Sequence, residues 1–341
     1  RYTSQPKMII LQQLLLCSQQ DFVQVMHVID DMGGSFVDYF VYNIETISEQ
    51  YDQFILYMDN DNKLKSQFIL SNLINLPGKS TALQFEICYQ YQIEHFFDSN
   101  EHQKYKAFIN QQQRGMNEME TKILFVFGQN GDGQFQHHGL KSLPKQILNY
   151  INNTVFIDGG AYIGDSAAIF QLYNASKVIS FDLVPQHVVK YKNNMELLDI
   201  DPLKYEIIQK GLSDHNHTLK FRFDGSGSNI FASFGEDVEM ITLDSVMQSY
   251  HDDVEVQKNR VGFIKFDLEG AGFDALVGSL ELLKRDRPVV SIAIYHSPIE
   301  FFKVKKVLNT VFGDSYTYKI EKHDYSESYY IEINIVAYPK L

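Results

Sequence analysis

The feature that most constrains the fold is an apolar run that ends in an acid and a glycine-rich turn. The run at 155–157 leads into the turn DGGAYIG at 158–164, and a helical pattern begins near Asp165. A strand, a turn and a helix in this order are typical of open α/β sheets, which bind ligands at the carboxyl ends of their strands. Glycines let the backbone approach a ligand, because they carry no Cβ. We therefore expect a ligand above this turn, in contact with Gly159, Gly160, Ala161 and Gly164.

The second half of the chain alternates between strand and helix patterns. Continuous apolar runs predict strands that are covered on both faces, as in a parallel sheet. They lie at 155–157, 178–181, 205–208, 261–266 and 289–294, with helical patterns at about 165–172, 186–198 and 273–283. Two further segments, 316–320 and 329–337, flank a polar turn and predict an antiparallel hairpin that closes the sheet. The fold class is therefore α/β with a mostly parallel sheet.

The first half of the chain predicts a different organisation. Apolar residues recur there at spacings of three and four, which indicates a mainly helical N-terminal region at 1–125. The second domain is expected at 126–341, with its core at 150–338. A short strand is expected at 122–127, and an aromatic-rich helix at 82–97.

Local sequence patterns argue against a membrane span, a calcium loop and a histidine metal site. The apolar stretch at 8–17 is too short to cross a bilayer, so we expect no membrane span. The polar loop at 128–133 lacks the final Glu of a calcium loop. The adjacent pair His137 and His138 would point in different directions on a regular element, so we expect no metal site.

Charge and cysteine content narrow the partners and the compartment. Lys and Arg number 30 against 43 Asp and Glu, which gives a formal net charge of −13. An acidic surface repels phosphate backbones, so nucleic acid is not expected as a partner. Only Cys17 and Cys88 are present. Two thiols do not make a disulfide framework, and we expect a reducing, cytoplasmic location.

The acid in the glycine-rich turn indicates which nucleoside the site takes. Dinucleotide sites use G-x-G-x-x-G to hold a pyrophosphate, whereas this turn places Asp158 beside the ligand. A carboxylate suits the cationic amino-acid end of S-adenosylmethionine and would repel a pyrophosphate. Asp182 ends the next strand, 24 positions later, where an acid accepts hydrogen bonds from ribose hydroxyls. Ser213 and Asp214 follow the third strand and either contact the adenine amine or form an ordinary turn.

Three further polar residues follow the fourth and fifth strands. Asp267 and Glu269 lie two positions apart at the end of the fourth strand and therefore face the same side. They could position a hydroxyl, act as a base or contribute to a metal site, although two carboxylates alone are no metal signature. His296 follows the fifth strand and faces the same cleft.

Several segments together resemble the FkbM family of methyltransferases. The matching stretches are VFIDGGAYIGDSA (155–167), VISFDLVP (178–185), KGLSD (210–214), GSGS (225–228), MITLDSV (240–246), GFIKFDLEGAG (262–272) and IAIYHSP (292–298). Their order and spacing fit over about 150–338. The resemblance implies a class I, Rossmann-like methyltransferase fold with a seven-stranded sheet, S-adenosylmethionine as the donor, and methylation of an oxygen on a sugar or polyketide-like natural product.

The resemblance also implies residue roles. The donor loop is matched by Asp158, Gly160 and Gly164, the ribose acid by Asp182, and the active-site rim by Asp267, Glu269 and His296. Two positions depart from the family's pattern. The ribose acid is usually Glu, and the family motif E-G-A-E reads Glu269-Gly270-Ala271-Gly272 in this chain, so its second acid is replaced by Gly272.

The sequence therefore predicts an S-adenosylmethionine-dependent O-methyltransferase that acts on a hydroxyl of a sugar, glycan or related natural product. The acceptor is a small molecule or a glycan. Of the three rim residues, His296 is preferred as the base, because the ordinary pKa of histidine suits neutral pH.

Two alternatives belong to other classes. A domain that binds the donor weakly or not at all would serve as an interaction module, and the loss of the acid at Gly272 favours this alternative. A nicotinamide-dependent oxidoreductase would require the G-x-G-x-x-G turn, which is absent. The helical N-terminal region could form an acceptor lid, a docking surface or the dimer interface of a homo-oligomer.

Overall fold

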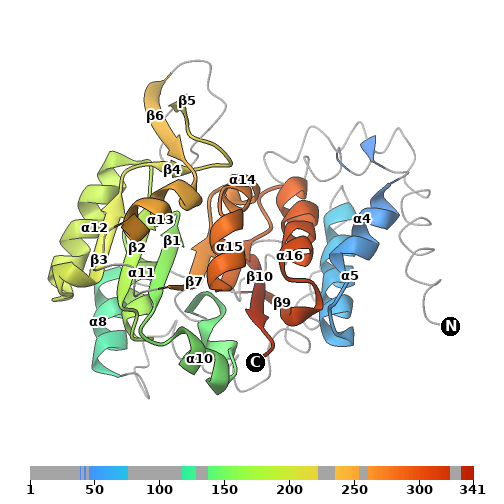
Figure 1. Ribbon diagram of the computed structural model, residues 1–341, viewed down its shortest axis with the longest axis horizontal. Helices are drawn as coiled ribbons and strands as arrows, with labels where there is room; N and C mark the ends of the chain where they lie inside the picture. Colours follow the sequence, from blue (N-terminus) through green and yellow to red (C-terminus); the bar gives the residue numbers. More distant parts are fainter. Residues whose placement is uncertain are drawn as a thin grey trace.

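The computed structural model describes residues 39, 42–43, 46–75, 117–127, 137–221, 235–252, 260–322 and 332–341. A central sheet lies between two layers of helices, and a smaller sheet projects beyond one end of its strands (Figure 1). The helix predicted at 82–97, the loop at 128–133 and the GSGS stretch at 225–228 lie outside the described residues.

The central sheet has seven strands in the order β3-β2-β1-β7-β8-β10-β9. Their bounds are β1 Val155–Gly159, β2 Lys177–Phe181, β3 Tyr205–Ile208, β7 Val261–Phe266, β8 Val289–Ala293, β9 Tyr316–Lys322 and β10 Ile333–Pro339. The strands β3, β2, β1, β7 and β8 run parallel, whereas β10 is antiparallel to both β8 and β9. The predicted α/β class, the mostly parallel sheet and the closing hairpin are confirmed.

Both faces of the sheet are covered, which explains why its strands are continuously apolar. In β1, Phe156 packs into the core on one face and Ile157 into the core on the other, because successive side chains of a strand point to opposite faces. The Phe156 face is covered by α8 Glu118–Phe127, α10 Lys145–Ile151, α11 Asp165–Gln171 and α12 Pro185–Leu197. The Ile157 face is covered by α13 Leu243–Asp252, α14 Gly272–Val277, α15 Leu280–Asp286 and α16 Lys305–Phe312.

The strand predicted at 122–127 is wrong, because this segment is the second half of helix α8. The helix starts with a reciprocal capping box. The backbone N–H of Glu120 donates to Asn117 Oδ1 at 2.8 Å, and the N–H of Asn117 donates to Glu120 Oε2 at 2.8 Å. The periodicity of a short apolar run is the same in a strand and in a buried helix segment. In this segment the capping box favours the helix.

The single helix predicted at 273–283 is interrupted. Helix α14 ends at Val277, α15 begins at Leu280, and the turn between them contains Gly278. A Cβ on Gly278 would lie 2.0 Å from the carbonyl oxygen of Ser213, so the turn packs directly against the loop after the third strand. This close approach requires glycine and ends the helix.

The smaller sheet was not anticipated from the sequence. It contains β4 Gly211–Leu212, β6 Glu236–Ile241 and β5 His217–Phe221, in that order. Strand β4 pairs with β6 in parallel, and β5 pairs with β6 antiparallel. Figure 1 shows this sheet beyond the ends of β1 and β2, next to α13 and α14. It therefore stands beside the edge at which the predicted site lies.

The described part of the N-terminal region is helical, as predicted, and packs against the far edge of the sheet. Helices α4 Ile47–Phe54 and α5 Asn60–Asn75 lie beside α16 and β9 (Figure 1). The backbone N–H of Ile320 in β9 donates to Asn62 Oδ1 at 2.7 Å. The buried Lys305 donates to the carbonyl oxygen of Leu56 at 2.8 Å. The domain boundary near 125 stays a prediction.

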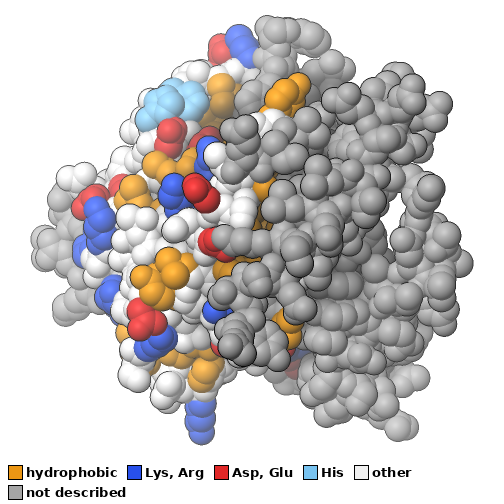
Figure 2. Space-filling view, turned by 90° about the vertical axis from the view of Figure 1, so that its right-hand side faces the viewer, with side chains coloured by type: hydrophobic (Ala, Val, Ile, Leu, Met, Phe, Trp, Pro, Cys, Tyr) orange, Lys and Arg blue, Asp and Glu red, His pale blue; other side chains and the backbone are white. Residues whose placement is uncertain are grey.

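Two surface properties bear on partners. No helix in the described part of the chain has both the length and the apolar character needed to cross a membrane. On the face shown in Figure 2, the coloured Lys and Arg side chains lie among Asp and Glu side chains instead of gathering in one basic patch.

Candidate functional site

The ends of β1, β2 and β7 form one continuous edge, where the sequence predicted the site. The N–H groups of Gly160 and Ala161 both donate to the carbonyl oxygen of Phe181 at 3.0 Å. The N–H of Asp267 donates to the carbonyl oxygen of Gly159 at 3.1 Å. The glycine-rich turn is thus bonded to the end of β2 on one side and to the end of β7 on the other.

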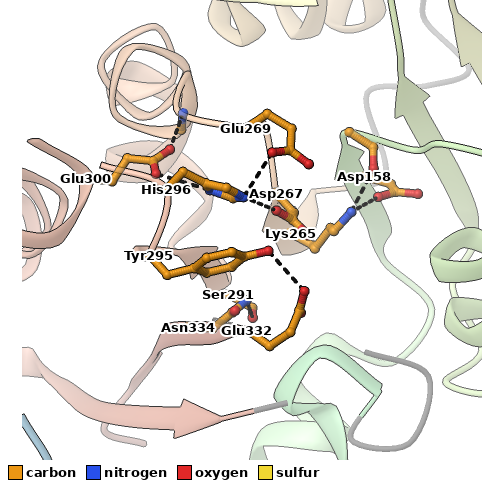
Figure 3. A network of polar contacts seen from close by, with 12 residues as sticks. Asp158, Lys265, Asp267, Glu269, Ser291, Tyr295, His296, Glu300, Glu332 and Asn334 are labelled. Carbon is orange, nitrogen blue, oxygen red and sulfur yellow. Dashed lines mark hydrogen bonds and ion pairs between the residues drawn. The ribbon is translucent and has the colours of Figure 1, made fainter. Parts of the chain in front are cut away.

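A buried ion pair lies beneath the glycine-rich turn (Figure 3). Lys265 Nζ is 3.2 Å from Asp158 Oδ1 and donates to the carbonyl oxygen of Gly160 at 2.8 Å. The side chains of Asp158 and Lys265 are 0% and 3% exposed. Burial raises the pKa of Asp158 to about 6, and the charge of Lys265 limits the rise. Asp158 Oδ2 is buried without a hydrogen-bond partner among the described residues.

This ion pair was missed by the sequence reasoning. Lys265 is the one charged residue in the buried strand β7, where register pairing places it directly beside Asp158 in β1. A lysine inside an apolar strand signals a buried partner, because a lone buried charge is costly. Asp158 is therefore part of the support of the turn, and only Oδ2 is left to meet a ligand.

Gly160 shows that the turn needs glycine. Its φ is +78°, a region that L side chains rarely adopt, and a Cβ there would lie 1.9 Å from the carbonyl oxygen of Asp267. The backbone of the turn and the backbone after β7 are thus closer than any side chain allows. The close approach is thus between two segments of backbone, and the approach of the turn to a ligand stays a prediction.

Asp182, the predicted ribose acid, is held by three donors. Its Oδ2 accepts from the N–H of Tyr162 at 2.8 Å, and its Oδ1 accepts from the N–H of Val184 at 2.8 Å. His187 Nδ1 lies 3.1 Å from the same Oδ1, and the Tyr162 ring meets the His187 ring edge-on at 4.6 Å between centroids. The carboxylate is therefore fixed next to the glycine-rich turn. His187 was not predicted.

Ser213 and Asp214 lie where the small sheet meets the end of β1. The neighbouring Leu212 has its Cδ1 3.3 Å from the place where a Cβ on Gly159 would stand. Ser213 is buried, and its Oγ donates to Asp214 Oδ1 at 3.3 Å. Asp214 is more open and pairs with His215 Nδ1 at 2.6 Å, which lowers the pKa of Asp214. Both residues adjoin the edge, and their contact with an adenine stays a prediction.

His296 lies among three carboxylates at the end of β8 (Figure 3). Its Nδ1 is 3.2 Å from Glu300 Oε2, while its Nε2 is 3.3 Å from Asp267 Oδ1 and 3.6 Å from Glu269 Oε2. The imidazole side chain is only 3% exposed, and its Nε2 has no hydrogen-bond partner among the described residues. Asp267 is 30% exposed and Glu269 70%, so both carboxylates reach the surface, and their role as the active-site rim stays a prediction.

The reason for preferring His296 as the base does not hold in the folded protein. Burial alone would lower its pKa, but the hydrogen bond with Glu300 and the charges of Asp267, Glu300 and Glu269 outweigh burial and raise the pKa to about 9. The imidazole is therefore protonated at neutral pH. It donates a hydrogen bond from Nδ1 to Glu300, and its charge stabilises the nearby carboxylates, which are the better proton acceptors.

A second polar pair extends the network toward β10. Tyr295 OH donates to Glu332 Oε1 at 3.0 Å, and burial is the main reason that the pKa of Tyr295 is raised. Glu269 and Glu332 both have positive φ, 49° and 55°. Non-glycine residues with positive φ are uncommon and concentrate at functional sites.

Within the described residues, no cluster of three or more His, Cys, Asp or Glu side chains has the geometry of a metal site.

Comparisons with known proteins indicate to which protein family the residues of this site belong. Residues 158–326 match the family described as "Methyltransferase FkbM domain". A crystal structure of the methyltransferase FkbM from Methylobacillus flagellatus KT is similar over 90% of this chain and 62% of that chain, with 14% identity and a TM-score of 0.55. The chain thus spans less than two-thirds of the length of that protein. At this identity the likeness supports the fold alone.

Two other solved structures are more distant. An rRNA methylase from Streptococcus thermophilus matches with 15% identity and a TM-score of 0.36, over 57% of this chain and 92% of that chain. A methyltransferase from Podospora anserina, crystallised with SAH, matches with 7% identity and a TM-score of 0.36, over 72% of this chain and 97% of that chain. No curated protein sequence matches the chain.

Proposed function

Residues 158–326 are an FkbM-family, S-adenosylmethionine-dependent methyltransferase domain, and from this premise we propose that the chain methylates a hydroxyl of a sugar, glycan or related natural product. One observation carries the choice of acceptor. The partly open carboxylate of Asp267 and the more exposed carboxylate of Glu269 lie side by side at the end of the sheet, 3.3 and 3.6 Å from the buried His296 Nε2. A sugar has hydroxyls on adjacent carbons, so one can donate to Asp267 while its neighbour donates to Glu269.

The residues around the glycine-rich turn fit the donor. Asp158 Oδ2 is a buried acceptor to which no described residue donates. We assign the glycine turn and Asp158 to the amino-acid end of S-adenosylmethionine, Asp182 to the ribose hydroxyls, and Ser213 with Asp214 to the adenine. When bound, S-adenosylmethionine supplies an activated methyl group, whose C–S bond breaks as the new O–C bond forms.

The chain itself has to orient the acceptor and remove its proton. Asp267 takes the hydroxyl proton, because its carboxylate is open to the acceptor and its own N–H is hydrogen-bonded to Gly159 in the donor loop. His296 carries a positive charge and holds the Asp267 carboxylate in place. Glu269 stands at the rim and meets the neighbouring hydroxyl of the acceptor. Alignment by such groups supplies most of the rate of an already activated transfer.

The acceptor class is tested with methyl-labelled S-adenosylmethionine and three panels: neutral oligosaccharides, matched amino sugars and RNA. We expect label on oligosaccharide hydroxyls as a stable methyl ether. Asp267→Asn should lower turnover by about 100-fold or more, since a positioned general base contributes on that scale. Label transferred to amines or to RNA would contradict the proposal.

Donor binding is tested separately by calorimetry. The demethylated product SAH should bind the wild type and Asp267→Asn with the same affinity, because we assign Asp267 to the acceptor side. NAD should not bind. A chain that binds neither ligand would be an interaction module instead of an enzyme. The cytoplasm stays the proposed compartment, on the basis of the two cysteines in the sequence.

A further inference from the structure

The carboxylate of Glu300 joins two parts of the site. Its Oε1 accepts from the N–H of Gly272, the first residue of α14, at 2.9 Å. Its Oε2 is 3.2 Å from His296 Nδ1. Glu300 begins the π-helix η4 (Glu300–Val304), and it is 0% exposed. A fully buried carboxylate with one oxygen on each partner leaves little freedom for the imidazole that it holds.

The same carboxylate occupies the space toward which position 272 points. A Cβ built on Gly272 would lie 2.8 Å from Glu300 Oε1 and 3.6 Å from its Cδ. Position 272 is the one at which the sequence lacks the second acid of the E-G-A-E pattern. An acid therefore does stand beside His296, but it comes from an element 28 positions further along the chain.

We propose that Glu300 is a positioning residue of the methyltransferase site, that it takes the place of a side chain at position 272, and that it fixes His296 with Nδ1–H toward itself and Nε2–H toward Asp267. The role of Glu300 in methyl transfer rests on the proposed function. Its geometry does not depend on which acceptor is methylated.

The physical reason lies in the protons of the imidazole. A carboxylate only accepts hydrogen bonds, so Glu300 requires a proton on Nδ1. The charges of Asp267 and Glu269 then favour a second proton on Nε2. The Tyr295 ring lies against the imidazole with 4.0 Å between ring centroids and limits its rotation. With Gln at position 300, the amide can still accept from Gly272 but presents an NH₂ group to Nδ1, which disfavours the doubly protonated ring.

The test is an NMR titration of His296 in the full chain, with ¹³C-labelled histidine and with His296→Gln to assign the signal. In the wild type the signal should titrate near pH 9. Glu300→Gln should lower this midpoint by at least about one pH unit, because it removes the charge-assisted hydrogen bond. An unchanged midpoint would overturn the proposal.

Two further variants test whether an acid at position 272 can replace Glu300. Glu300→Ala should lower the midpoint, and Glu300→Ala combined with Gly272→Glu should restore it, because the acid returns from the other side of the same space. A folded double variant with a low midpoint would refute the exchange. Gly272→Ala is an independent check, since its Cβ would push the Glu300 carboxylate off His296 and should also lower the midpoint.

Binding of SAH separates this proposal from the proposed function. Glu300 contacts none of the residues assigned to the donor, so Glu300→Gln should bind SAH within about twofold of the wild type, a difference well below one hydrogen bond. Loss of SAH binding in the wild type would refute the proposed function and leave the His296 titration intact. Loss confined to Glu300→Gln would show that Glu300 supports the donor site instead of positioning His296.

Discussion

Lys265 and Asp158 form an ion pair across two neighbouring parallel strands, with 3.2 Å between Nζ and Oδ1 and almost no exposure of either side chain. Lys265→Met removes one partner and leaves a buried carboxylate with a raised pKa. Unpairing a buried charge costs about 3–5 kcal/mol. We expect a loss of unfolding free energy of that order, measured by urea denaturation at pH 7.

The matched control is Lys284→Met, which removes an exposed ion pair with Glu281. Exposed pairs contribute about 0–1 kcal/mol, so this variant should be nearly neutral. Adding Asp158→Asn to Lys265→Met should recover part of the lost stability, because no charge is then left buried. Equal effects of Lys265→Met and Lys284→Met would show that the buried pair is not what supports the turn.

Gly160→Ala should damage both stability and donor binding. Gly270→Ala is the comparison, because Gly270 also has a positive φ, +102°, but no described atom lies within 4 Å of its Cβ position. The backbone strain alone costs on the order of 1–3 kcal/mol in each variant. The contact with the Asp267 carbonyl arises only in Gly160→Ala, so this variant should unfold at a lower urea concentration and bind SAH more weakly. Indistinguishable variants would contradict the close approach.

Asp182→Ala should weaken SAH binding by about 10- to 100-fold, which corresponds to the loss of one or two hydrogen bonds to a charged group. Asp237→Ala serves as the control, since Asp237 forms an exposed ion pair with Lys220 on the small sheet. Both affinities are measured by calorimetry. An affinity of Asp182→Ala equal to that of the control would remove Asp182 from the ribose site.

The charge on His296 makes stability depend on pH. Its pKa in the folded protein is about 9, above the value of about 6.5 in an unfolded chain. The resulting stabilisation is fully present below pH 6.5 and is lost as the pH rises through 9. It is on the order of 3 kcal/mol. The unfolding free energy of the wild type should therefore fall between pH 6.5 and 9 relative to His296→Gln, as measured by urea denaturation. A constant difference would contradict the raised pKa.

The main sheet could be predicted because each of its strands is marked by residues that are adjacent in the sequence. Strands buried on both faces are mostly apolar, and Asp158 lies near the end of such a strand while Asp182 and Asp267 follow one, so their shared edge follows from parallel order. The missed residues have partners elsewhere in the chain. Lys265 carried a readable signal, a charge inside an apolar strand. Glu300 stands four positions after His296, a spacing that was not used, and its bond to Gly272, 28 positions earlier, had no local signal.

The hydrogen bond from Ile320 to Asn62 bears on how the protein behaves when shortened. Strand β9 is the last strand of the sheet, and its outward N–H groups would otherwise be free to pair with a strand of another molecule. Helix α5 covers this border and Asn62 satisfies one of its donors. A chain shortened to the methyltransferase fold would lose this cover, and we expect it to self-associate edge to edge even where the ends of β1, β2 and β7 keep their arrangement.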